Sequence, residues 1–438
     1  MRRPTITALL FVIAMIGLYP EANAQGVEWE VLNKEVMSLY QKGQYDRALV
    51  VAKKALAVAE KAAGPNHSSV ATSLNNLGLL YQTQGQYALA EPFYKRSLAI
   101  WEKTNHPSVA QSLNNLADLY RTQGQYAQAE PLYKRSLAIK EKIFGPNNPD
   151  VAMSLNNLAT LYQSQGQYAQ AETLYKRSLA ITEKAFGPHH LSVATSLSNL
   201  AVLYQSQGQF TLAEPLCKRS LAIREKALGT DHPDVAQSLN NLALLYQAQG
   251  QYALAEPLYK RSLAIIEKVV GPNHLYVATT LNNLAAVYQT QGEYTQAATL
   301  YKRSLAIKES SFSPDHPAVA TSLSNLAELY RTQGQYTQAE PLHKRSLAIR
   351  EKALGPGHPD VATSLNNLAL LYHAQGQFTQ AEPLYKKSLA IIENTLGPSH
   401  PDVATILENL AKLYRVTGRN TEAESLETRA DRIHKLKR

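Results

Sequence analysis

Apolar positions in the chain recur at helical spacing, in pairs of segments separated by a glycine. Between residues 232 and 271 they form two faces, Val235, Leu239, Leu242, Ala243 and Tyr246, and then Tyr252, Ala255, Tyr259, Leu263 and Ile266. Spacings of three and four place each set on one side of a helix. His232-Pro233 begins the first segment and Gly271-Pro272 ends the second, as expected for helix boundaries. The pattern predicts two antiparallel helices, here called A and B, joined by a tight turn at Gly250.

The same unit is repeated along the chain. The glycines of Gln-Gly-Gln and its variants are residues 43, 85, 124, 166, 208, 250, 292, 334, 376 and 418, so that eight intervals are 42 residues and one is 39. A fixed period of this size predicts stacked helix pairs, in which each unit contacts only its neighbours and stability is close to a one-dimensional sum. We therefore expect an all-α solenoid of about ten helix pairs.

The residues within each unit identify a family resemblance. The segment Leu239-Asn240-Asn241-Leu242-Ala243-Leu244-Leu245-Tyr246, followed by Gly250, Tyr252, Ala255-Glu256 and Tyr259, resembles the tetratricopeptide repeat, and the 42-residue period resembles the long variant of kinesin light chains. The resemblance covers roughly Glu28 to Arg429 and implies a right-handed superhelix. We assign residues 25–430 to the array, with polar first and last units as caps, and residues 431–438 to a short basic tail.

The resemblance implies that helix A lines the concave groove. One asparagine recurs there in nine units: Asn76, Asn115, Asn157, Asn199, Asn241, Asn283, Asn325, Asn367 and Asn409. Primary amides both donate and accept hydrogen bonds, which suits the backbone of an extended peptide. The alternative is that these amides connect neighbouring helices and bind no ligand.

Three residues after each asparagine, the units differ from one another. We interpret this variable set as the selectivity positions of the groove: Leu79, Asp118, Thr160, Val202, Leu244, Ala286, Glu328, Leu370 and Lys412. Asp118 precedes Arg121 by three residues, and Glu328 precedes Arg331 by the same interval. These two pairs are expected to form intrahelical ion pairs, the simpler interpretation of both.

The first 24 residues have the features of a secretory signal peptide. A basic Met1-Arg2-Arg3 precedes an apolar run from Ile6 to Tyr19, and Ala22-Asn23-Ala24 forms a small-residue cleavage site. The alternative, an uncleaved anchor, is disfavoured because the run is shorter than the ~20 residues that span a bilayer. We expect cleavage before Gln25 and export to the periplasm or beyond.

Charge adds a regular basic feature to helix B. The formal net charge is +9, and the basic pairs are Lys95-Arg96, Lys134-Arg135, Lys176-Arg177, Lys218-Arg219, Lys260-Arg261, Lys302-Arg303, Lys344-Arg345 and Lys386-Lys387. Glu256 precedes Lys260 by four residues, and this pair and its equivalents favour a solvated, partly neutralised convex face. Contact with an anionic membrane surface is the weaker interpretation, and export argues against nucleic acid as a partner.

No set of residues departs from the repeat pattern as a catalytic centre would. Eight histidines occupy the same inter-unit loop and are interpreted as helix-start residues, and Cys217, which replaces a core tyrosine, as a buried thiol. We expect no catalytic residue, metal or cofactor. The sequence therefore favours an exported, non-enzymatic scaffold that holds a partner protein or extended peptide in its groove. The alternatives are a structural protein of the cell envelope that acts through its ends or basic face, and a helper of a separate enzyme.

Overall fold

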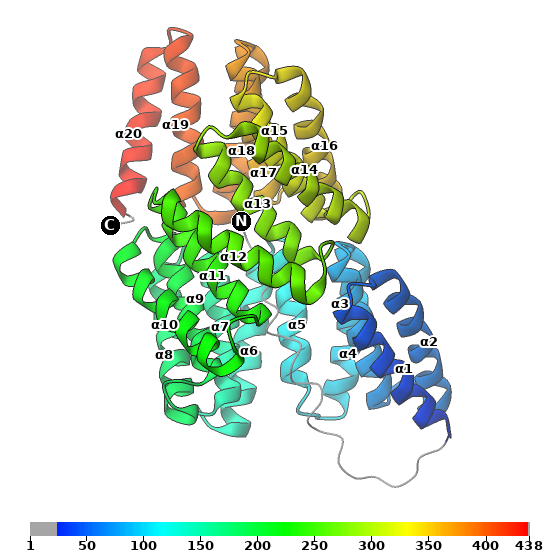
Figure 1. Ribbon diagram of the computed structural model, residues 1–438. Coiled ribbons are helices and arrows are strands. Elements are labelled where there is room, and N and C mark those ends of the chain that lie inside the picture. The colour runs from blue at the N-terminus through cyan, green and yellow to red at the C-terminus, as the bar shows by residue number, and fades with distance from the viewer. Residues whose placement is uncertain (1–23, 437–438) are drawn as a thin grey trace.

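A computed structural model describes residues 24–436, which form twenty α-helices (Figure 1). In chain order they are α1 Ala24–Gln41, α2 Tyr45–Ala63, α3 Ser68–Thr83, α4 Tyr87–Lys103, α5 Val109–Thr122, α6 Tyr126–Phe144, α7 Pro149–Ser164, α8 Tyr168–Phe186, α9 Leu191–Ser206 and α10 Phe210–Leu228. They continue as α11 Pro233–Ala248, α12 Tyr252–Val270, α13 Leu275–Thr290, α14 Tyr294–Ser311, α15 Pro317–Thr332, α16 Tyr336–Leu354, α17 Pro359–Ala374, α18 Phe378–Leu396, α19 Pro401–Val416 and α20 Asn420–Leu436. The predicted all-α array of ten helix pairs is confirmed, with odd-numbered helices as A and even-numbered helices as B.

Local sequence fixes where each helix begins and ends. His232 caps α11 through its side chain, which accepts a hydrogen bond from the backbone N–H of Asp234 at 3.1 Å. Gly250 and Gly271 have φ values of +74° and +88°, a backbone region that L side chains rarely adopt. The interpretation of the loop histidines as helix-start residues is confirmed at seven positions, where the histidine is the N-cap: His67, His190, His232, His274, His316, His358 and His400. His106 accepts a bond from the backbone N–H of Ser108, but Ser108 is the N-cap of α5.

The apolar faces pack as the periodicity predicts. Val235 and Leu239 of α11 and Tyr259 of α12 are fully buried, and one cluster of buried residues extends from Val36 in α1 to Leu329 in α15. Each A helix packs on its own B helix and on the helices of the adjacent units. The core is therefore a continuous layer between successive helix pairs.

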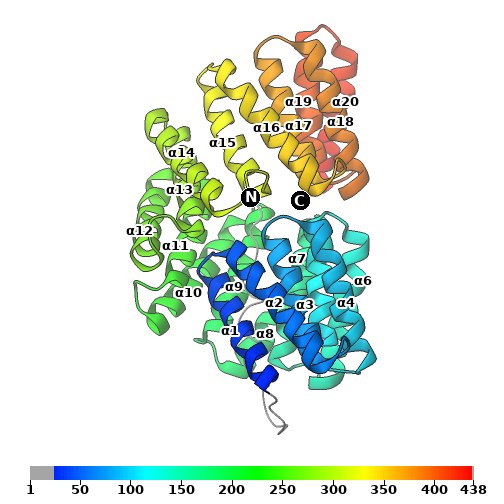
Figure 2. The same cartoon turned by 90° about the vertical axis from the view of Figure 1, so that its right-hand side faces the viewer.

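Successive turns of the superhelix also contact each other (Figure 2). Two edges of the array make this contact. We call the short Gln-Gly-Gln connections between helices A and B the turn edge, with its glycines at 43, 85, 124, 166, 208, 250, 292, 334, 376 and 418. We call the loops between units the loop edge, with loops ending at His67, His106, Asn148, His190, His232, His274, His316, His358 and His400. The loop before α15 lies on the turn after α3, where His316 Nε2 is 2.8 Å from the carbonyl oxygen of Thr83. The loop before α17 lies on the turn after α5, where His358 Nε2 is 3.0 Å from the carbonyl oxygen of Thr122.

Two further pairs extend this inter-turn contact. His400, before α19, lies against Gly166, because a Cβ added to that glycine would be 2.9 Å from His400 Cδ2. Tyr45 of α2 stacks on Phe312, which follows α14, with ring centroids 5.9 Å apart. The expectation that each unit contacts only its neighbours is therefore wrong. The array is long enough for its last units to close onto its first.

The two ends of the chain complete the description. The predicted signal peptide lies outside the described residues, apart from its last residue, Ala24, where α1 begins. α20 continues to Leu436 and so includes most of the segment assigned to a basic tail. Within residues 24–436, no helix is both long enough and apolar enough to cross a membrane.

Candidate binding groove

The asparagine column forms a ladder of hydrogen bonds between neighbouring A helices. Asn283 Nδ2, for example, donates to Asn240 Oδ1 of the preceding A helix at 3.0 Å. The same bond to the preceding A helix is made by Asn76 to Asn33, Asn115 to Asn75, Asn157 to Asn114, Asn325 to Asn282, Asn367 to Ser324 and Asn409 to Asn366. These amides connect units, as the alternative interpretation of the column holds. One such bond leaves further hydrogen-bonding capacity on each amide.

The ladder is interrupted at the fifth unit. Asn156 Oδ1, the atom that Asn199 would reach in this pattern, is buried and has no hydrogen-bond partner among the described residues. Asn199 itself is half-buried. The column is therefore uniform in sequence but not in its contacts, and Asn199 is the position where a ligand competes least with the ladder.

Most residues of the variable set are partly exposed on the A helices. Val202 and Lys412 are the most open, Val202 with 41% of its surface exposed. Asp118 lies in a polar cluster, where its carboxylate accepts bonds from Gln82 Nε2 at 2.9 Å and from Arg121 Nη2 at 2.5 Å. The expected ion pair with Arg121 is confirmed, so this carboxylate is already neutralised.

The eighth unit carries the second charged pair. Arg331 Nη2 is 2.6 Å from Glu328 Oε1, which confirms the other expected ion pair. His343 replaces the core tyrosine beside them, is 1% exposed, and has no partner for either ring nitrogen within the described part of the chain. Burial lowers the pKa of His343 to about 4, so the ring is neutral at pH 7.

A row of glutamines that sequence reasoning missed lies next to the variable set. Gln82 accepts the hydroxyl proton of the core residue Tyr94 at 2.9 Å while its Nε2 donates to Asp118 of the next unit. The same tyrosine–glutamine bond joins Tyr175 to Gln163, Tyr259 to Gln247 and Tyr301 to Gln289. The signal was present, since these glutamines recur three residues after the variable position and would otherwise be ordinary surface residues.

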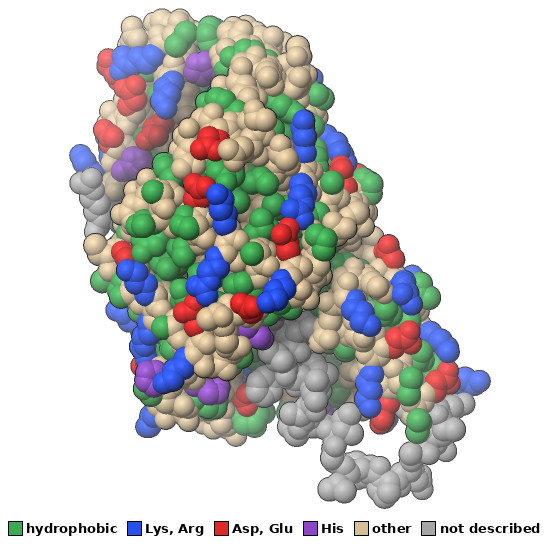
Figure 3. Space-filling model, in the orientation of Figure 1, with side chains coloured by type: hydrophobic (Ala, Val, Ile, Leu, Met, Phe, Trp, Pro, Cys, Tyr) green, Lys and Arg blue, Asp and Glu red, His purple; other side chains and the backbone are tan. Residues whose placement is uncertain are grey.

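The convex face carries paired charges. Lys95 lies 2.7 Å from Glu91, and seven lysines make this pair four residues after a glutamate: Lys95, Lys134, Lys176, Lys218, Lys260, Lys344 and Lys386. The following basic residue pairs with a glutamate of the preceding unit, as Arg261 does with Glu225 at 2.8 Å. Lys302 differs because Ala298 stands at the glutamate position. Figure 3 shows blue and red side chains interspersed on one face of the molecule.

The remaining candidates for chemistry are buried or isolated. Cys217 is 5% exposed, and burial raises the pKa of its thiol to about 12, so it is not a thiolate nucleophile at neutral pH. Among the described residues, no group of three or more His, Cys, Asp or Glu side chains is arranged to hold a metal ion.

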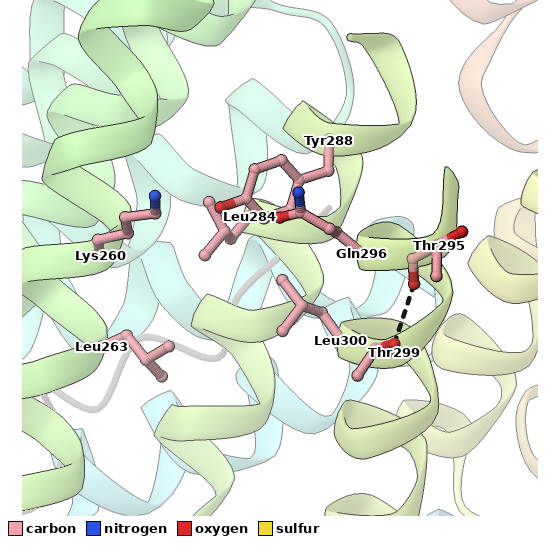
Figure 4. A pocket seen from close by; sticks show the side chains of 8 residues that line it. All are labelled: Lys260, Leu263, Leu284, Tyr288, Thr295, Gln296, Thr299 and Leu300. Atoms are coloured by element: carbon pink, nitrogen blue, oxygen red, sulfur yellow. Dashed lines mark hydrogen bonds between the residues drawn. The ribbon is translucent and has the colours of Figure 1, made fainter. Parts of the chain in front are cut away.

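An open apolar depression of about 400 Å³ lies between α12, α13 and α14 (Figure 4). Its lining residues are Lys260, Leu263, Leu284, Tyr288, Thr295, Gln296, Thr299 and Leu300. The set contains no residue of the asparagine column or of the variable set. The depression is therefore separate from the predicted groove.

Comparison with known proteins identifies the family. The tetratricopeptide repeat profile matches nine overlapping segments: residues 30–103, 81–142, 108–184, 150–226, 192–268, 234–310, 276–352, 318–393 and 360–433. The chain belongs to the tetratricopeptide repeat family. Among curated proteins, no significant match is found.

Several solved structures are similar to this tetratricopeptide repeat protein. A putative kinesin light chain from Podosopora anserina is 32% identical over 47% of this chain and 97% of its own, with a TM-score of 0.39. BtubC (BKLC) from P. vanneervenii is 23% identical over 54% of this chain and 92% of its own, with a TM-score of 0.41. A Rap protein complexed with Competence and Sporulation Factor is 13% identical over 94% of this chain and 99% of its own, with a TM-score of 0.53. The 32% identity with the Podosopora anserina repeats, over 97% of that chain, confirms the resemblance to kinesin light chain repeats.

Proposed function

We propose that this repeat protein is an exported, non-enzymatic scaffold that binds an extended segment of a partner protein in the groove of its A helices. The observation that carries the proposal is the variable set, in which partly exposed side chains change from unit to unit while the surrounding scaffold repeats. A constant frame with one variable row provides a surface that can distinguish ligands. The Rap protein that shares the fold over most of this chain is itself complexed with a named factor.

In the proposal, two sets of residues bind different parts of the ligand. The asparagine column binds the ligand backbone through donors and acceptors that its bonds between helices do not use, and Asn199 does so without a bond to Asn156. The variable set then selects ligand side chains. Most lysines of the convex face are paired with glutamates. This pairing disfavours the alternative of an envelope protein that acts through its basic face, and it also disfavours binding of nucleic acid or a membrane surface.

A matched pair of variants tests the use of the groove. Val202 on α9 and Leu212 on α10 belong to the same unit and are 41% and 49% exposed, but only Val202 belongs to the variable set. A partner captured from periplasmic extract by the wild-type protein is expected to bind Val202→Asp at least tenfold more weakly and Leu212→Asp normally. Equal binding to both variants would contradict use of the groove, and retention of residues 1–24 in the mass of the exported protein would contradict export.

The asparagine column needs a separate test because its members differ in contact. Asn199→Ala is expected to weaken binding with little change in Tm, since a hydrogen bond to a ligand contributes ~1 kcal/mol and alanine favours the helix. Asn283→Ala removes the bond to Asn240 and is expected to lower Tm as well. If Asn199→Ala leaves the affinity unchanged, the column has only the structural role.

A further inference from the structure

The turn edge is covered at Gly85, Gly124 and Gly166 and open at the later turns. At the first turn, a Cβ added to Gly43 would meet no described atom within 4 Å, although Tyr45 beside it stacks on Phe312. At Gly85, an added Cβ would be 2.7 Å from Pro317 Cδ, and at Gly124 it would be 3.1 Å from His358 Cδ2. At the glycines of the later turns, 208, 250, 292, 334, 376 and 418, the same atom would meet no described atom within 4 Å. The later turns therefore present the same backbone to solvent that the first turns present to a loop.

The aromatic residues that begin the B helices follow this division in part. Tyr87 and Tyr126, beside covered turns, are 7% and 3% exposed, whereas Tyr45 and Tyr168, also beside contacted turns, are half-buried. Their equivalents beside open turns are only half-buried: Phe210, Tyr252, Tyr294, Tyr336 and Phe378. An aromatic row is thus incompletely covered along the open part of the turn edge.

The loop edge shows the complementary division. Phe312, the last apolar residue before a covering loop, stacks on Tyr45 at an interplanar angle of 4°. Three equivalents in earlier loops, Phe144, Phe186 and Val270, are 40%, 44% and 36% exposed within the described part of the chain. His190 and His232 also keep the capping role of His316, in which Nδ1 accepts a backbone hydrogen bond, so that Nε2 carries the proton and is free to donate.

We propose that the open loop edge of one molecule docks on the open turn edge of a second copy, so that the chain assembles head to tail. The occupant is a second copy because the molecule already makes this contact with itself, through the same residue types on both edges. The two surfaces differ from each other, so the contact is heterologous and leaves one free edge at each end of the assembly. An open-ended series of oligomers follows, rather than a closed dimer.

Sedimentation velocity of the purified chain, as the cell processes it, tests the proposal over a concentration series. The weight-average sedimentation coefficient is expected to rise with concentration past the value for a dimer. A loop-edge variant, Phe144→Ser with Phe186→Ser, and a turn-edge variant, Gly292→Asn with Gly334→Asn, are each expected to remain monomeric. Asparagine is chosen because it tolerates positive φ better than other side chains.

Mixing the two variants gives the sharpest readout. Each retains one intact edge, so an equimolar mixture is expected to form a one-to-one dimer and nothing larger. The control is Leu212→Ser with Leu254→Ser, which removes equally exposed apolar side chains and should assemble normally. Their equivalent beside a covered turn, Leu89, remains 51% exposed and so lies outside the contact.

Three results would overturn the proposal. The first is a wild-type protein that is monomeric at every soluble concentration. The second is a single-edge variant that still associates with itself although its melting curve shows native folding. The third is a mixture of folded variants that stays monomeric while the wild type assembles.

Discussion

The turns at Gly85 and Gly208 have nearly the same sequence and backbone but different surroundings. Their φ values are +72° and +73°, and both follow an A helix and precede an aromatic residue. The first lies beneath Pro317 and His316, whereas the second faces no described atom within contact distance. The period fixes the form of each unit, but the number of units before and after it decides whether that unit is covered. Stability is therefore a property of position in the array as well as of the repeat.

The largest expected effect is that of removing one unit. Deleting residues 230–271 removes one helix pair and one interface between neighbouring units. It also removes one contact between successive turns of the superhelix, because each such contact joins two units that are six apart in the array. We expect a soluble, helical protein whose free energy of unfolding falls by several kcal/mol, on the order of the sum of these contributions. Denaturant unfolding followed by circular dichroism measures it.

The control for this deletion keeps the length of the array. Replacing residues 230–271 with a copy of residues 188–229 preserves the number of units and all inter-turn pairings, so it should lose much less stability. A deletion variant that does not fold would count against an array of separable units. A deletion and a replacement of equal stability would show that neither the unit nor the inter-turn contact contributes.

The next effect isolates the inter-turn contact by substituting glycines. Gly85, Gly124 and Gly166 changed together to Asn place a Cβ within 2.7 to 3.1 Å of the covering loops. The control set, Gly208, Gly250 and Gly376 changed to Asn, imposes a similar positive φ without a neighbour. Overpacking costs about 1–3 kcal/mol per site, so the first set should have the lower Tm. The comparison is made at a concentration where both proteins are monomeric.

Equal melting temperatures for the two sets would mean that the turns of the superhelix do not touch in solution. A lower Tm for the control set would mean that the open turns are covered by something else.

The sequence predicted the unit more completely than the array. Helix pairs, helix starts at histidine and the ion pairs at Asp118 and Glu328 all depend on residues close in the chain, so their spacing was informative. The contact of His358 with Thr122 joins residues 236 positions apart, and nothing local distinguishes His358 from His190. Because the repeat is nearly constant, the loop sequence is similar whether another turn of the superhelix covers the loop or not.

The candidate site shows the same limit. Asn283 and Asn240 are 43 residues apart, so their bond depends on how neighbouring units are rotated. The sequence identifies the asparagine column because the residue is the same in nine units, but a constant asparagine is expected both for binding a ligand and for bonding neighbouring helices. The sequence identifies the variable set because its residues differ between units, and the role of this set in selecting ligands remains a prediction.

A smaller effect appears with pH. Burial lowers the pKa of His316 to about 4, with Lys308 lowering it further and the bond to Thr83 opposing the shift. The unfolded chain, with a histidine pKa near ~6.5, binds more protons than the folded chain between these values. Stability should therefore be lost as the pH falls from about 6.5 towards 4.

The variant His316→Asn should lose less stability over this window. Asn148 shows that asparagine can cap a helix at this position, because its side chain accepts a bond from the backbone N–H of Asp150 at 2.9 Å. Carboxylates titrate alike in both proteins, so the difference in Tm between pH 6.5 and 4.5 reports His316. Parallel pH profiles would contradict the buried, neutral state of this ring.

The smallest expected effect compares one covered histidine with one open histidine. Both His358 and His190 cap a helix through Nδ1, but only His358, which is 5% exposed, also reaches a carbonyl oxygen of another turn. Asparagine preserves the cap in either position, so the difference between His358→Asn and His190→Asn isolates the bond to Thr122. A net hydrogen bond contributes roughly 1 kcal/mol, so losing the bond to Thr122 should cost about that much. Urea unfolding should therefore place the midpoint of His358→Asn below that of His190→Asn, with unchanged slopes. Coincident midpoints would show that the covered and open edges are energetically the same, and the distinction between them would then be one of geometry alone.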